Sequence, residues 1–184
     1  VVVAIIGILA AVGVNTFSGF QEKAKISTVK AIHKNVEKYI RAEVLKCELG
    51  EATIFNNGEY GPLACTGKYG ASGPKAAIYV RDRIGDNGKI FNDKNPYDTA
   101  NFAVKRGGSY TVGQITIGAN PTTLTLYTCT KTGCAAADKI TAQKNFTDNE
   151  NFEIDNPVTA LQCAQLGLED LVNKSEFPEA NQFI

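Results

Sequence analysis

The residue types that do chemistry at neutral pH are scarce in this sequence. His33 is the one histidine, and it lies between Lys30 and Lys34 in a stretch with helical periodicity. A histidine acts as a general base only beside a nucleophile or a substrate proton, and no cysteine or serine is spaced to use this one. A lone helical histidine is typical of a packing or solvated residue. We therefore expect no catalytic residue and no enzyme activity.

Two other patterns resemble ligand sites only in part. The segment from Gly61 to Lys68 is similar to a phosphate-binding loop, but it has one residue too many between its glycines. Tyr69 also stands where a serine or threonine must reach magnesium. Oxygen ligands for calcium are grouped near the C-terminus, without the spacing of an EF-hand, at Asp148, Glu150, Glu153 and Asp155. We interpret this group as a solvated acidic loop and expect no metal site and no cofactor.

The five cysteines predict structural disulfides. None of them forms a C-x-x-C pair, which argues against a zinc ribbon or a thioredoxin-like redox site. Cys129 and Cys134 bracket a four-residue turn, and Cys47 ends a predicted helix whose following loop contains Cys65. We predict these two local pairs and a free thiol at Cys163, where a buried thiol behaves as a small hydrophobe.

These residues must be positioned by a long element at the start of the chain. The first fourteen residues contain no charge and no strong hydrogen-bonding side chain, and a chain terminus is a difficult place to bury. A membrane-spanning helix needs about 20 apolar residues, so we expect about seven more to precede this run. The apolar run consists of Val1, Val2, Val3, Ala4, Ile5, Ile6, Gly7, Ile8, Leu9, Ala10, Ala11, Val12, Gly13 and Val14.

The helical pattern continues into an amphipathic half. Apolar residues recur at intervals of three and four, which places them on one face of a helix, at Ile26, Val29, Ile32, Val36, Ile40, Val44 and Cys47. The other side is filled by Lys30, Lys34, Glu37, Lys38 and Arg41. Gly50 stands where a left-handed C-terminal cap belongs. We expect one helix through residue 49, with residues 1–25 projecting from a globular domain of residues 26–184.

The rest of the chain predicts a small α+β domain. The pattern predicts a short helix that starts near Ser72 and ends at Gly85, with a strand over Ile78-Tyr79-Val80 as the alternative. Residues 92–98 form a loop. Residues 111–117 and 123–128 have the period of strands and are joined by a turn, with a third strand at 139–143. Asn156-Pro157 begins a final helix that includes Leu161 and Leu168. We expect a small antiparallel sheet packed on the long helix.

The segment Val3-Ala4-Ile5-Ile6-Gly7-Ile8-Leu9-Ala10-Ala11-Val12 resembles the N-terminal signature of type IV pilins and the related type II secretion pseudopilins. The likeness covers about the first twenty residues. The family's peptidase cleavage site and its glutamate would precede Val1, and Asn15 stands about where many members have a helix-kinking proline. The resemblance implies the pilin architecture. It also offers a rival disulfide, Cys47–Cys163, which would tie the two terminal helices together.

The resemblance implies a structural function. The chain would be the major subunit of an extracellular pilus filament on a bacterial surface, held in the inner membrane as a precursor. Its partners would be identical subunits, a prepilin peptidase, an assembly ATPase and a membrane platform. The alternatives are a minor pilin, a type II secretion pseudopilin or a monomeric membrane-anchored binding module. Lys plus Arg and Asp plus Glu each number 19, and a neutral chain gives no electrostatic argument for nucleic-acid binding.

Overall fold

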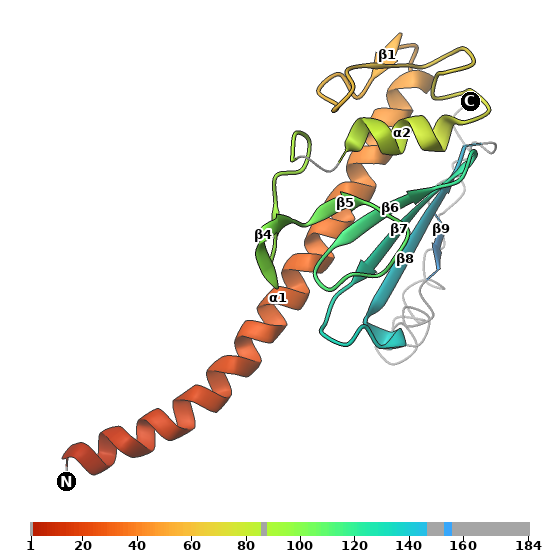
Figure 1. The fold of residues 1–184 in the computed structure, drawn as a ribbon. Helices are drawn as coiled ribbons and strands as arrows, with labels where there is room; N and C mark the ends of the chain where they lie inside the picture. Colours follow the sequence, from red (N-terminus) through yellow and green to blue (C-terminus); the bar gives the residue numbers. More distant parts are fainter. Residues whose placement is uncertain (1, 86–87, 147–152, 156–184) are drawn as a thin grey trace, which may run out of the picture.

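The protein has an α+β fold organised around one long helix (Figure 1). The computed structural model describes residues 2–85, 88–146 and 153–155, and it describes side chains for residues 18–85 and 88–146. Helix α1 runs from Val2 to Glu48 without interruption. At 1.5 Å per residue its 47 residues extend for about 70 Å. The lower part of α1 projects from the rest of the molecule, and the upper part lies against the sheet (Figure 1).

The end of α1 follows the sequence prediction. Gly50 has a φ of 91°, and its amide group donates to the carbonyl group of Cys47, while the amide of Glu51 donates to the carbonyl of Lys46. A residue with a side chain would be strained in this left-handed conformation, whereas glycine adopts it freely. The predicted cap is therefore confirmed.

The main sheet contains five strands in the order β5-β6-β7-β8-β9. Their bounds are Val104–Arg106 for β5, Ile115–Ala119 for β6, Thr123–Cys129 for β7, Lys139–Asn145 for β8 and Glu153–Asp155 for β9. The three predicted strands are β6, β7 and β8, and their antiparallel order is confirmed. In the turn between β6 and β7 the side chain of Asn120 accepts hydrogen bonds from the amide groups of Thr122 and Thr123.

The main sheet has two strands more than the three predicted, and one of its pairings is parallel. Strand β5 pairs with β6 in parallel, with Val104 opposite Ile115. Strand β9 pairs with β8 and places Asp155 opposite Thr141, within the segment that was predicted as an acidic loop. Both additions are three residues long. Main-chain pairing at the sides of an existing sheet does not require a hydrophobic alternation, so such short strands have no sequence signature.

Two small hairpins lie outside the main sheet. Strands β1 (Thr53–Ile54) and β2 (Leu63–Ala64) pair after the end of α1, and β3 (Lys94–Asn95) pairs with β4 (Asp98–Phe102). The prediction of a loop over residues 92–98 was therefore wrong in part. Helix α2 (Ala76–Ile84) begins after Lys75, close to its predicted start, and ends at Gly85 as expected. The predicted final helix and Cys163 lie outside the described residues.

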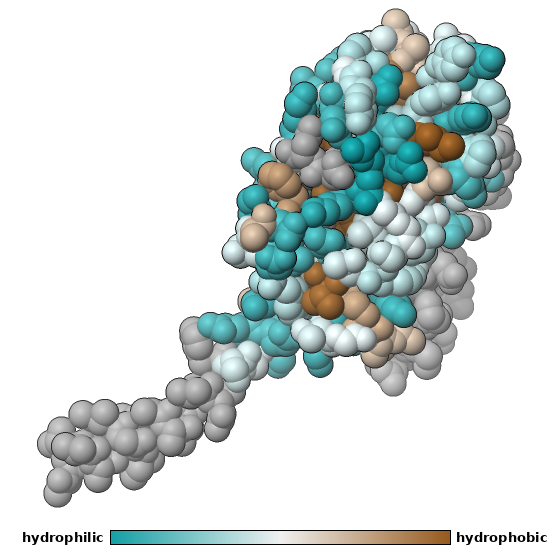
Figure 2. All heavy atoms as spheres, in the orientation of Figure 1, coloured by the Kyte–Doolittle hydropathy of each residue, from teal (hydrophilic) through white to brown (hydrophobic). Residues whose placement is uncertain are grey.

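The core lies between the upper half of α1, helix α2 and the inner face of the sheet. Among the described side chains of α1, those of residues 18–48, the fully buried ones are Val29, Val36 and Ile40. Burying one such aliphatic side chain stabilises a fold by about 1.5–3 kcal/mol. The opposing members of this core, all 2% exposed or less, are Ile54, Phe55, Leu63, Val80, Ile84, Ile115, Ile117, Leu124 and Leu126. On the face shown in Figure 2, hydrophobic residues appear only as small, separate patches.

Candidate functional site

The projecting part of α1 is the feature that distinguishes this molecule from a closed globular domain. Ser18, Gly19, Phe20 and Gln21 are all exposed, and the side chain of Phe20 is 69% exposed. Among the α1 side chains that the structure describes, from Ser18 onward, the first that is fully buried is Val29. Of the predicted filament-core residues, 2–14 all lie on this helix, and Val1 falls outside the described residues. We call residues 2–20 the stem.

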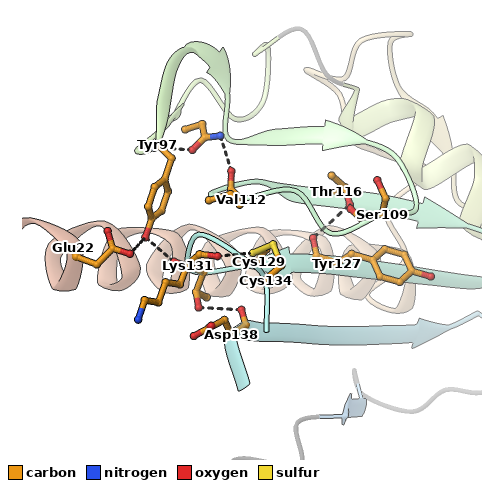
Figure 3. Close-up of a disulfide and its surroundings, with 12 residues drawn as sticks. Glu22, Tyr97, Ser109, Val112, Thr116, Tyr127, Cys129, Lys131, Cys134 and Asp138 are labelled. Atoms are coloured by element: carbon orange, nitrogen blue, oxygen red, sulfur yellow. Dashed lines mark hydrogen bonds between the residues drawn. A yellow bond between two sulfur atoms is a disulfide. The ribbon is translucent and has the colours of Figure 1, made fainter. Parts of the chain in front are cut away.

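The stem ends at a polar contact with the globular part (Figure 3). The hydroxyl group of Tyr97, in the turn between β3 and β4, lies 3.1 Å from the carboxylate of Glu22 and 2.9 Å from the carbonyl oxygen of Thr130. The ammonium group of Lys25 lies 5.1 Å from the centre of the Tyr97 ring. Burial and the hydrogen bond to Glu22 raise the pKa of Tyr97 to about 12. Tyr97 therefore stays protonated and links three segments at the point where α1 leaves the domain.

The turn that presents Tyr97 is fixed by Asn95. Its side-chain oxygen accepts a hydrogen bond from the amide group of Tyr97, and its side-chain nitrogen donates to the carbonyl group of Val112. Asn95 is 3% exposed. Sequence reasoning missed both residues, because an Asn-Pro-Tyr segment indicates a turn without indicating what the turn contacts.

Above this contact, α1 carries polar residues on its buried face. His33 is 3% exposed, and its Nδ1 atom lies 2.9 Å from the hydroxyl oxygen of Thr128 on β7. Burial and the neighbouring charge of Lys34 lower the pKa of His33 to about 4, so the ring is neutral at pH 7. His33 is a packing residue that hydrogen-bonds the helix to the sheet.

Two glutamates of α1 are also buried. Glu37 is 8% exposed and accepts a hydrogen bond from the guanidinium group of Arg41 at 2.8 Å, so its predicted place on the outer side was wrong. Glu43 accepts a hydrogen bond from the amide group of Phe55 at 2.6 Å and from the ammonium group of Lys46. Phe55 has a φ of 52°, which is unusual for a residue with a side chain. Glu43 thus holds the strained turn after β1 against α1.

The disulfides of the structure are Cys47–Cys65 and Cys129–Cys134. These are the two local pairs predicted from the sequence. The first joins the end of α1 to the residue after β2, and the second closes the turn between β7 and β8 (Figure 3). Cys47 has Cys65 as its partner, so it is not available for the rival pair with Cys163.

Among the described residues, no group of three or more potential metal ligands is found. Gly61–Lys68 does not have the strand-loop-helix context of a phosphate-binding loop, since Leu63 and Ala64 form β2 and Cys65 forms a disulfide. A pocket of about 130 Å³ lies beside Cys47–Cys65 and is lined in part by Val44, Glu48 and Phe146. It is smaller than the 300–1,000 Å³ typical of small-molecule sites.

In the part of the chain that the structure describes, no helix carries an apolar stretch long enough to cross a membrane. Searches of known protein families, curated proteins and solved structures found no match to this chain. The candidate site is therefore defined by its own geometry. It consists of the stem, the contact among Tyr97, Glu22 and Thr130 at its base, and the exposed side of α1 above that contact.

Proposed function

We propose that this protein is a structural subunit that polymerises into an extracellular filament through the stem, as the major subunit of a type IV pilus does. One observation carries the proposal: an apolar sequence stands on a helix that has already left the globular part by Phe20 (Figure 1). An apolar helix of this length that projects from its domain needs a partner outside that domain. Side-by-side packing of stems from identical subunits would provide it.

The energetics favour assembly through many similar contacts. The apolar run contains Ile5, Ile6, Ile8 and Leu9 besides its valines. A side chain of this kind contributes about 1.5–3 kcal/mol when fully buried, so several together exceed what scattered polar surface contacts supply. Before assembly the same residues would lie in the lipid of the inner membrane. The processing peptidase and the assembly machinery are the transient partners that this proposal implies.

The globular part is suited to a structural role. Its core is small, and the Cys47–Cys65 disulfide and two buried hydrogen bonds, His33–Thr128 and Phe55–Glu43, hold its segments against α1. The second disulfide closes the turn between β7 and β8. Disulfides are typical of small domains in oxidising compartments, which agrees with an extracellular location. This arrangement stiffens the half of α1 that the domain covers.

The proposal is tested by charging the stem. In the full-length chain, replacing Ile8 and Val12 by lysine places two charges on the apolar surface that would be buried between subunits. We expect the variant to form no fibres in negative-stain microscopy of material sheared from cells, whereas the unaltered chain forms abundant ones. The matched control replaces Leu49, which is 77% exposed just beyond the end of α1, by lysine; its fibres should be normal.

Fibres of unchanged diameter from the stem variant would overturn the assignment of the stem as the filament core. If the unaltered chain forms no fibres of its own, a minor pilin, a secretion pseudopilin or a monomeric membrane-anchored module replaces the major-subunit assignment.

A further inference from the structure

The Cys129–Cys134 disulfide lies directly beside the contact at the base of the stem (Figure 3). Thr130 follows Cys129 in the chain, and its carbonyl oxygen lies 2.9 Å from the hydroxyl group of Tyr97. The same hydroxyl group lies 3.1 Å from the carboxylate of Glu22 on α1. The disulfide is therefore connected to α1 through the main chain of the turn and a single tyrosine side chain.

Cys129 also supports the hairpin that presents Tyr97. The carbonyl oxygen of Cys129 accepts a hydrogen bond from the amide group of Gly113, and Val112 pairs with Cys129 in an isolated parallel bridge. The carbonyl oxygen of Val112 in turn accepts the side-chain hydrogen bond of Asn95, which fixes the turn at Tyr97. Cys129 and the residue after it therefore hold Tyr97 from two directions, by its turn and by its hydroxyl group.

The disulfide restrains the connection between β7 and β8, which runs from residue 130 to residue 138. Thr130 is 3% exposed, and its amide and hydroxyl groups both donate to the carbonyl group of Asp138 at the far end of this connection. Residues 131–133 are exposed. A cross-link reduces the number of conformations that a loop can adopt. Opening the bridge therefore leaves Thr130 attached only to the end of a longer and freer loop.

The bridge has one cysteine that is open to a reductant. Cys134 is half-buried and follows the exposed residues 131–133, whereas Cys129 is fully buried. Thiol–disulfide exchange requires that a thiolate reach one of the two sulfur atoms. One thiolate of a dithiol attacks the Cys134 sulfur and releases the Cys129 thiolate, and the second thiol of the reagent then releases Cys134. Two electrons and two protons pass to the protein, and the dithiol becomes a cyclic disulfide.

We propose that the Cys129–Cys134 disulfide is a redox-sensitive lock on the contact at the base of the stem. The oxidised bridge holds Thr130 and the turn of Tyr97 in place against α1. Reduction by a dithiol loosens that contact and lets α1 open more often around residues 20–25. The lock belongs to the single subunit and goes beyond the proposed filament function. In a filament subunit, the lock would fix the direction of the stem only after oxidation, in a compartment where disulfides form.

Amide hydrogen exchange in the full-length chain tests the lock. The unaltered chain is compared before and after reduction by a dithiol, with the free thiols verified by alkylation and mass spectrometry. We expect reduction to accelerate exchange at residues 20–25 by about fivefold, the effect of losing one hydrogen bond, and to leave residues 33–40 unchanged. A chain with Cys129→Ala and Cys134→Ala should exchange fast at residues 20–25 with or without the dithiol. This variant separates the effect from that of the Cys47–Cys65 disulfide.

The matched control carries Cys47→Ala and Cys65→Ala, which removes the bridge at the other end of α1. While oxidised, it should keep slow exchange at residues 20–25. A Tyr97→Phe chain already lacks the connecting hydroxyl group, so reduction should change its exchange there by less than about twofold.

Three outcomes would overturn the lock. They are unchanged exchange at residues 20–25 in the fully reduced unaltered chain, equal acceleration in the Tyr97→Phe chain, and equal acceleration at residues 33–40. The last would mean that reduction weakens the whole fold and not the stem contact. The measurement needs no fibres, so the filament function stands or fails separately, by microscopy of the unaltered chain.

Discussion

The two halves of α1 have the same secondary structure and opposite environments. From Val29 to Cys47 one side of the helix contacts strands β6 and β7 of the sheet and strand β1, whereas Phe20 in the stem is 69% exposed. The backbone passes from one half to the other without a break. Helical hydrogen bonds are local to the chain, so the helix does not need a packed face to continue. What differs is the tertiary packing, which gives the upper half its part in stability. Under the proposed function, the other half is the one that assembles.

The polar residues follow the same division. In the upper half, His33, Glu37 and Glu43 lie on the buried side and each has a hydrogen-bond partner. At the base of the stem, Glu22 and Lys25 lie at the margin of the domain and contact Tyr97. Buried polar groups contribute to stability only when they are paired, so the upper half should be far more sensitive to substitution than the lower half.

The largest expected effect is the loss of core packing in the upper half. Replacing Ile40, which is fully buried, by alanine should lower the free energy of unfolding by about 2–5 kcal/mol because it leaves a cavity. Leu45→Ala on the exposed side of the same helix should cost less than about 0.5 kcal/mol. Denaturant titration of both full-length variants measures the difference. Equal losses would show that the two sides of α1 are not packed as described.

The next effect distinguishes the two disulfides. Cys47 and Cys65 are 18 residues apart and Cys129 and Cys134 are 5 apart. In the chain-entropy model the first bridge contributes about 3 kcal/mol and the second about 2 kcal/mol. Replacing both cysteines of one bridge by alanine, each bridge in turn, and measuring unfolding should give that order. A larger loss from the Cys129–Cys134 pair would mean that the turn before β8 matters more than the end of α1.

A smaller effect, confined to acidic pH, belongs to His33. Its pKa is near 4 when folded and about 6.5 when unfolded, so the unfolded chain binds the proton more readily. The stabilisation is complete above pH 6.5 and is lost as the pH falls towards 4. At pH 4.5 the loss is on the order of 2 kcal/mol. His33→Gln should unfold with a shallower dependence between pH 7.5 and 4.5, and an identical dependence would contradict the buried neutral ring.

The smallest effect is expected at the base of the stem. Tyr97→Phe removes the hydroxyl group that bonds Glu22 and the carbonyl group of Thr130, at a cost of about 1 kcal/mol. Amide hydrogen exchange should rise around residues 20–25 and stay unchanged around residues 33–40. The control Tyr110→Phe removes a hydroxyl group that bonds Thr141 on the sheet and should leave exchange in α1 unchanged. Faster exchange along the whole helix would show that the two halves are not independent.

Local features of the sequence determined much of this structure. The long helix, its glycine cap, helix α2, the strands β6 to β8 and both disulfide pairs follow from periodicity, turn residues and short separations along the chain. In each case the residues that form the sequence pattern and the residues that interact in the structure are close together along the chain. The role of the apolar stem stays a prediction, which rests on the composition of residues 1–14.

Only the tertiary structure decided the contacts between distant segments. Tyr97 meets Glu22 across 75 residues, and His33 meets Thr128 across 95. Glu37 and Glu43 have the sequence pattern of exposed charges, yet partners from the same helix and from the turn at Phe55 make their burial tolerable. The short strands β5 and β9 arise from main-chain pairing with a sheet that has to exist first. The hydrogen-bond partners and neighbouring strands of these residues come from segments that are distant in sequence. A local sequence pattern therefore does not identify them.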